Sequence, residues 1–99
     1  MARADKATIM AALSKSISAE ADPEGVTDLV AKQGRINIAA DPAEIGGAID
    51  RMKELPGYRW LAINAVDLFA ANPKTFGTKV GIMDPSGRVL KAADLPRPK

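Results

Sequence analysis

The side chains that could carry out chemistry here are carboxylates, hydroxyls, lysines and arginines, because the 99 residues include no histidine and no cysteine. That absence removes imidazole bases, thiolate nucleophiles, disulfides and the usual zinc and iron–sulfur ligands. Asp50 and Glu54 lie four residues apart and could serve in acid–base catalysis or hold a divalent ion. Such pairs more often form a solvated helix face. We therefore expect no catalytic residue, cofactor, metal site or enzymatic activity.

Two adjacent glycines, Gly46 and Gly47, are the next candidates for binding. Free amides at a helix N-terminus attract phosphate, but phosphate-binding glycines precede their helix, whereas this pair follows a predicted cap at Asp41. Each glycine inside a helix costs about 1 kcal/mol relative to alanine. We therefore expect an offsetting close contact, with another backbone of the fold or with a partner.

Positive charge is concentrated in the last quarter of the chain. Residues 73–99 carry six basic and two acidic side chains, whereas the whole chain has a net charge of only +2. This asymmetry favours an acidic partner, whether protein, nucleic acid or membrane surface. The candidate contact residues are basic side chains of the C-terminal segment and the middle of the chain: Lys74, Lys79, Arg88, Lys91, Arg51 and Lys53.

The elements that position these residues follow from hydrophobic periodicity. Ile9, Leu13 and Ile17 recur every four residues and predict an amphipathic N-terminal helix. The Asp-Pro-Glu triplet that opens residues 22–30 is typical of a helix start, and it predicts a second, short helix there. Polar and apolar residues alternate over 35–39, which predicts a short strand.

The middle of the chain contains the strongest local pattern. Asp41 can accept from free amides, Pro42 suits the first helical turn, and Glu44 can reach back to the cap. Together they predict a helix over 42–55. Residues 58–71 are apolar on nearly all sides; their length favours a helix for most of the segment, and a strand at its start stays open.

The C-terminal part predicts a hairpin. Residues 84–87 (Asp-Pro-Ser-Gly) have the preferences of a type I turn and separate two short strands, 78–83 and 88–92. Residues 95–99 contain two prolines and predict an extended tail. Residues 1–94 would then form one domain.

The predicted fold class is a small α+β domain, mainly helical, with the order α-α-β-α-α-β-β. From Thr27 onward this order is similar to that of a winged-helix domain, in which two helices and a hairpin wing engage DNA. The resemblance implies a nucleic-acid-binding alternative, in which the basic hairpin contacts the DNA backbone. Against it, residues 60–71 offer almost no basic or amide side chains, apart from Asn64, for contacting base edges.

The leading hypothesis is a non-enzymatic protein-interaction module, an accessory or assembly subunit. It would contact a protein partner, or a second copy, through its N-terminal helix and its basic hairpin. No apolar run is long enough to cross a bilayer, and Lys15 interrupts the first apolar run too early for a signal peptide. We therefore expect a cytoplasmic protein without membrane contact.

Overall fold

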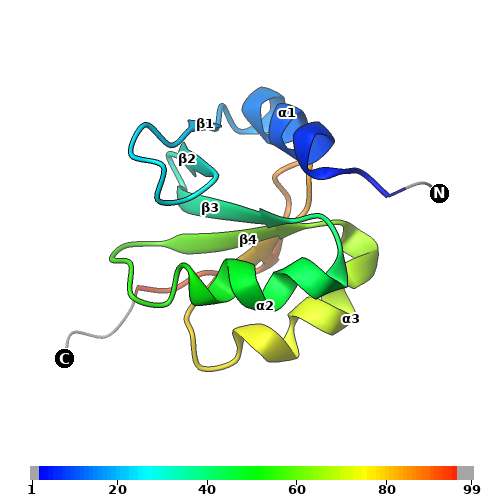
Figure 1. The fold of residues 1–99 in the computed structure, drawn as a ribbon, viewed down its shortest axis with the longest axis vertical. Coiled ribbons are helices and arrows are strands. Elements are labelled where there is room, and N and C mark those ends of the chain that lie inside the picture. The colour runs from blue at the N-terminus through cyan, green and yellow to red at the C-terminus, as the bar shows by residue number, and fades with distance from the viewer. Residues whose placement is uncertain (1–2, 96–99) are drawn as a thin grey trace.

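A six-stranded mixed sheet runs through the computed structural model, which describes residues 3–95 (Figure 1). In chain order, with η for 3-10 helices, the elements are α1 (Lys6–Ser16), β1 (Glu20–Ala21), β2 (Leu29–Ala31), β3 (Gly34–Ala39), α2 (Pro42–Asp50), β4 (Arg59–Ile63), η1 (Ala65–Asp67), α3 (Leu68–Ala71), η2 (Pro73–Thr75), β5 (Gly81–Met83) and β6 (Val89–Lys91). The strands lie side by side in chain order. The pairs β3–β4 and β4–β5 are parallel, and the other three pairs are antiparallel.

This arrangement corrects the predicted fold class. The α+β class holds, but the protein is not mainly helical, because six strands accompany three short α-helices. The predicted hairpin forms, yet it is not a projecting wing. Its first strand, β5, pairs with β4 inside the sheet, and Gly87 in its turn lies against Ile17 at the end of α1. The winged-helix order is therefore wrong.

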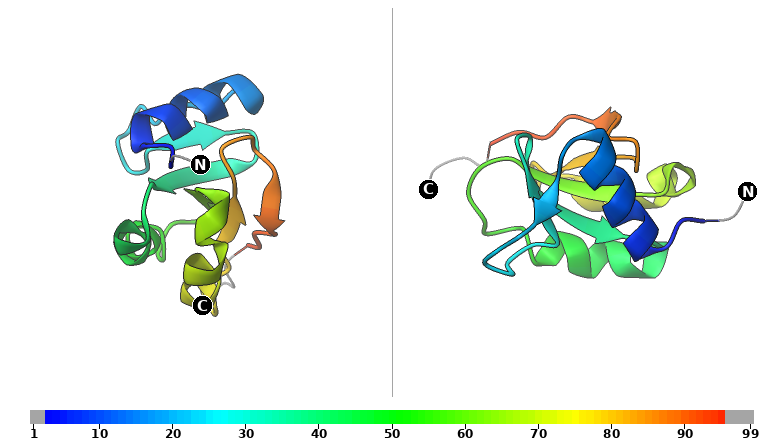
Figure 2. Two further views of the ribbon diagram at one scale, coloured as in Figure 1. Left: turned by 90° about the vertical axis from the view of Figure 1, so that its right-hand side faces the viewer. Right: turned by 90° about the horizontal axis from the view of Figure 1, so that it is seen from above.

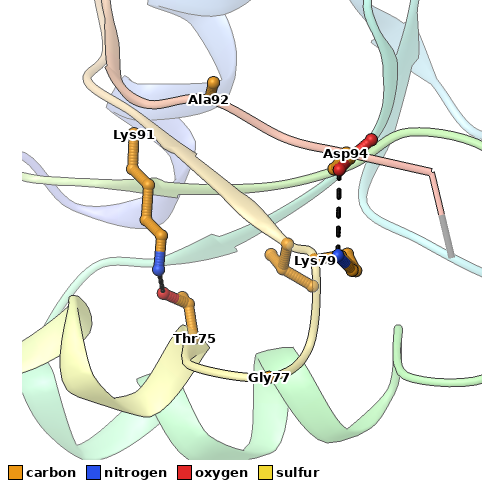
Figure 3. A pocket seen from close by; sticks show the side chains of 7 residues that line it. Thr75, Gly77, Lys79, Lys91, Ala92 and Asp94 are labelled. Carbon is orange, nitrogen blue, oxygen red and sulfur yellow. Dashed lines mark hydrogen bonds and ion pairs between the residues drawn. The ribbon is translucent and has the colours of Figure 1, made fainter.

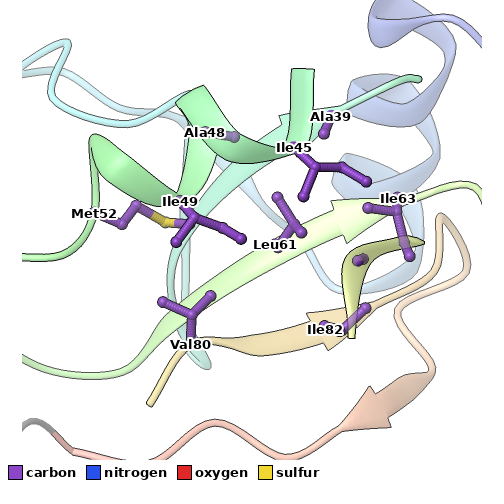
Figure 4. Close-up of a cluster of buried hydrophobic side chains, with 10 residues drawn as sticks. Ala39, Ile45, Ala48, Ile49, Met52, Leu61, Ile63, Val80 and Ile82 are labelled. Carbon is purple, nitrogen blue, oxygen red and sulfur yellow. The ribbon is translucent and has the colours of Figure 1, made fainter. Parts of the chain in front are cut away.

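Helices cover both faces of the sheet (Figure 2). On one face, α1 buries Ile9 and Leu13 against β2, β3 and β4. On the other face, α2 and α3 cover a second cluster (Figure 4), made of Ala39, Ile45, Ala48, Ile49, Met52, Leu61, Ile63, Ala71, Val80 and Ile82. The amphipathic N-terminal helix is thus confirmed, and its apolar stripe faces the sheet.

Strand β4 forms at the start of residues 58–71, where the sequence leaves a strand open while favouring a helix for most of the segment. Leu61 and Ile63 belong to the cluster under α2, whereas Trp60 and Ala62 belong to the cluster under α1. A strand covered on both faces has no polar alternation, so its sequence resembles that of a buried helix. The helical part of residues 58–71 is limited to η1 and α3.

The helix predicted over residues 22–30 is wrong: a loop and β2 take its place. The Asp22 carboxylate accepts from the backbone N–H groups of Glu24, Val26 and Thr27 at 2.9, 3.1 and 2.9 Å, and from Arg35 Nη1 at 2.9 Å. The amides of Thr27 and then Glu24 are the main groups that lower the pKa of Asp22 to about 2. Asp22 therefore organises a loop as a helix cap would, with no helix behind it.

Helix α2 begins as predicted and ends early. The Asp41 carboxylate accepts from the Ala43 amide at 2.8 Å, with Pro42 in the first turn. The helix ends at Asp50, and residues 51–54 continue as turns.

The strand predicted over residues 35–39 is confirmed within β3. Among residues 3–95, no helix has the length and apolar character needed to span a bilayer, and the predicted tail falls largely outside the described residues.

Replacing Gly81 and Gly46 by alanine should change the free energy of unfolding in opposite directions. A Cβ on Gly81 would lie 2.6 Å from the Ala93 amide nitrogen and 2.7 Å from the Trp60 ring, whereas a Cβ on Gly46 would meet nothing within 4 Å. We expect Gly81→Ala to lower the free energy of unfolding by about 1–3 kcal/mol and Gly46→Ala to raise it by about 0.5–1 kcal/mol. Urea titration measures both, and effects of the same sign would contradict the packing described.

The Asp22 loop makes stability depend on pH. We expect Asp22→Asn to be less stable than the native chain at neutral pH. Because the folded pKa lies near 2 and the ordinary value is 3.8, the unfolded chain binds this proton first. The stability difference should therefore shrink as the pH falls below about 4 and be largely lost by pH 2. Urea titrations of both proteins from pH 7 to pH 2 measure it, with Asp50→Asn as an exposed control; a constant difference would contradict this role.

Candidate functional site: a lysine-lined pocket beside the last strand

A pocket of about 230 Å³ lies between η2 and the C-terminal hairpin (Figure 3). Its lining comes from the segment that leads into β5 and from the end of β6 and beyond: Thr75, Gly77, Lys79, Val80, Lys91, Ala92 and Asp94. Three of these seven residues are charged, and two of the three are lysines. We call this the lysine-lined pocket.

Thr75 forms the buried wall of the pocket. Its side chain is 1% exposed, and its hydroxyl donates to the Asn72 carbonyl at 2.8 Å while accepting from Lys91 Nζ at 2.7 Å. Lys91 Nζ also lies 4.8 Å from the centre of the exposed Phe76 ring, within the range of a cation–π contact. Lys91 is therefore held in place by two contacts with the η2 region.

A β-bulge directs Lys91 toward this wall. Ile82 pairs with Lys91 and Met83 pairs with Val89, which leaves Leu90 as an extra residue in β6. Leu90 packs against the cluster under α2, and Lys91 reaches Thr75, so both side chains lie on the same side of the sheet. Bulges commonly redirect a side chain in this way.

Lys79 supplies the second ammonium group. Its backbone has a φ of 66°, in the left-handed region that few residues other than glycine adopt. Its carbonyl accepts from the Asp94 amide at 3.0 Å, and its Nζ lies 3.8 Å from a carboxylate oxygen of Asp94. Since the Asp94 side chain is 72% exposed, this ion pair contributes little and is open to competition.

Two ammonium groups and one carboxylate, that of Asp94, are the charged groups that line the pocket. A lysine ammonium group has three donors, and within residues 3–95 one donor of Lys91 goes to Thr75. The remaining donors of Lys91, together with Lys79, can bind carboxylate or phosphate oxygens. The described residues contain no group of three or more acidic side chains placed to hold a metal ion.

The predicted contact residues are only partly brought together. Lys79 and Lys91 line the pocket, and Lys74 lies on η2 next to Thr75. Arg88 follows the turn at the other end of the hairpin, near α1. Arg51 and Lys53 are exposed just after α2, outside the pocket lining, and Lys53 Nζ pairs with Asp50 at 3.0 Å.

A side chain added at either glycine of the pair would meet no close neighbour in the fold. Gly46 faces open space, and a Cβ on Gly47 would lie 3.9 Å from Arg51 Nη1. A role for this pair in contacting a partner stays a prediction.

Charge places Lys79 and Lys91 among six basic candidates, but it does not separate them from the other four and it marks no other residue of the site. Thr75 and Phe76 carry no local pattern that marks them, because their roles depend on Lys91, which lies 16 residues beyond Thr75 in the chain. Asp94 likewise becomes part of the site only through the pairing of its backbone with Lys79.

Comparison of this chain with protein-family models, with curated proteins and with solved structures found no match.

Proposed function

We propose that this protein is a non-enzymatic interaction module, an accessory or assembly subunit that holds an acidic partner protein at the lysine-lined pocket. The observation that carries the proposal is the convergence of Lys79 and Lys91, from separate segments, on one recess with a buried hydroxyl. The cytoplasmic location expected from the sequence stays part of this proposal.

A protein partner is favoured over nucleic acid by the surroundings of the pocket. Phe76, whose ring lies beside Lys91 Nζ, is 65% exposed, so apolar surface accompanies the lysines. Aromatic side chains are enriched at protein interfaces. Binding of a nucleic-acid backbone depends on several cations that reach successive phosphates, whereas Asp94 lies among the pocket residues and Arg88 lies at the other end of the hairpin.

The contact is assigned to the hairpin side of the molecule rather than to α1. Ile9 and Leu13, the apolar residues that made the N-terminal helix a candidate contact, are both fully buried against the sheet. A partner at α1 would meet mostly polar and alanine side chains.

Charge reversal at the pocket tests the proposal. We expect a fluorescein-labelled, flexible peptide of ten glutamates to bind the native chain at low salt. The Lys79→Glu/Lys91→Glu variant should bind this peptide at least about tenfold more weakly. Fluorescence anisotropy measures the affinity. Lys15→Glu/Lys32→Glu, with the same change in charge at exposed positions outside the pocket, is the matched control and should bind like the native chain.

A short DNA duplex is titrated in parallel. Equal weakening by both double variants would show that only net charge matters and would overturn the pocket assignment. Preference for the duplex, with an affinity that falls steeply with salt, would overturn the protein-partner proposal in favour of the nucleic-acid-binding alternative.

A further inference from the structure

The sheet ends at β6, which pairs with β5 on one side only. Within residues 3–95 no strand pairs with its other side, and Figure 2 shows β6 at the border of the sheet. An edge strand presents unpaired N–H and C=O groups, which another extended chain can use. The opposite edge, β1, has only two residues, Glu20 and Ala21, and is a shorter template.

Charge determines which chain can use the β6 edge. Arg88 precedes the strand and Lys91 ends it, whereas Asp84 is engaged within the turn, where it accepts from the amides of Ser86 and Arg88. Two copies that paired at this edge would bring like charges together, and the bulge further disfavours that pairing. An acidic chain would meet opposite charges instead.

The side chains beside β6 suit an alternating sequence. Val89 pairs with Met83, which belongs to the cluster under α1, and Val89 is half-exposed on that side. Lys91 lies on the other side, with Phe76 and the lysine-lined pocket. Because successive side chains of a strand point to opposite faces, an added strand would offer one set of residues to Val89 and the other set to Lys91.

We infer that the outer edge of β6 takes an extended, acidic segment of the partner protein as a seventh strand, with acidic side chains at the lysine-lined pocket and apolar side chains beside Val89. This inference rests on the proposed function and specifies how the partner binds. The backbone of β6 supplies hydrogen bonds to the segment, and Lys79 and Lys91 supply selectivity for acidic side chains.

Two labelled peptides of equal length and charge test the strand. One has four Val-Glu repeats; the other has four Pro-Glu repeats, which lack the N–H groups that a strand needs. We expect the native chain to bind the Val-Glu peptide at least about tenfold more tightly than the Pro-Glu peptide. The Val-Glu peptide should also slow amide hydrogen exchange in Val89–Lys91. Binding should be lost in Lys79→Glu/Lys91→Glu and retained in Lys15→Glu/Lys32→Glu.

The other outcomes separate this inference from the proposed function. Equal affinity for both peptides, weakened only by reversal at Lys79 and Lys91, would overturn strand addition and leave the proposed function standing. Peptide binding that ignores this charge reversal would overturn both. Sedimentation of the protein alone as a dimer, with slow exchange in β6, would overturn the acidic partner in favour of a second copy.

Discussion

The buried guanidinium group of Arg59 joins the turn that follows α2 to the sheet. Arg59, at the start of β4, is 1% exposed. Its guanidinium donates to the carbonyls of Met52 and Lys53 at 3.2 and 3.1 Å and to the Thr78 carbonyl at 2.7 Å. Burial lowers the pKa of Arg59, but an arginine starts so high that it stays charged. The carbonyls just beyond α2 thus compensate a cation that has no carboxylate partner among residues 3–95.

This interaction also places the lysine-lined pocket. Thr78 stands between Gly77 and Lys79, which both line the pocket, and its carbonyl is fixed by Arg59. The Thr78 hydroxyl donates to the Thr75 carbonyl at 2.6 Å, so the segment is held from both sides. These contacts hold Lys79 in its left-handed backbone conformation. Its side chain therefore lines the same pocket as that of Lys91. The candidate site depends on the core through this link.

Local chemistry explains what the sequence predicts correctly and what it cannot. The Asp41 cap, the turn over 84–87 and the four-residue spacing of Ile9 and Leu13 act within a few residues, so each is visible in the sequence and each forms. Strand β4 was harder to predict because burial on both faces removes its polar alternation. The triplet that begins at Asp22 wrongly predicts a helix, because the amides that bind the Asp22 carboxylate belong to a loop. In the site, charge marked Lys79 and Lys91, whereas the burial of Arg59 and Thr75 depends on contacts with distant residues.

Urea unfolding of Arg59→Met, with Arg88→Met as an exposed control, tests the central role of the buried cation most directly. Methionine fills part of the same space but leaves the three carbonyls without their donor. We predict that Arg59→Met lowers the free energy of unfolding by about 2–4 kcal/mol and that Arg88→Met changes it by about 0.5 kcal/mol or less. Apolar residues can replace buried charges without loss when the charge contributes nothing net. An Arg59→Met variant as stable as the native chain, or more stable, would contradict this account.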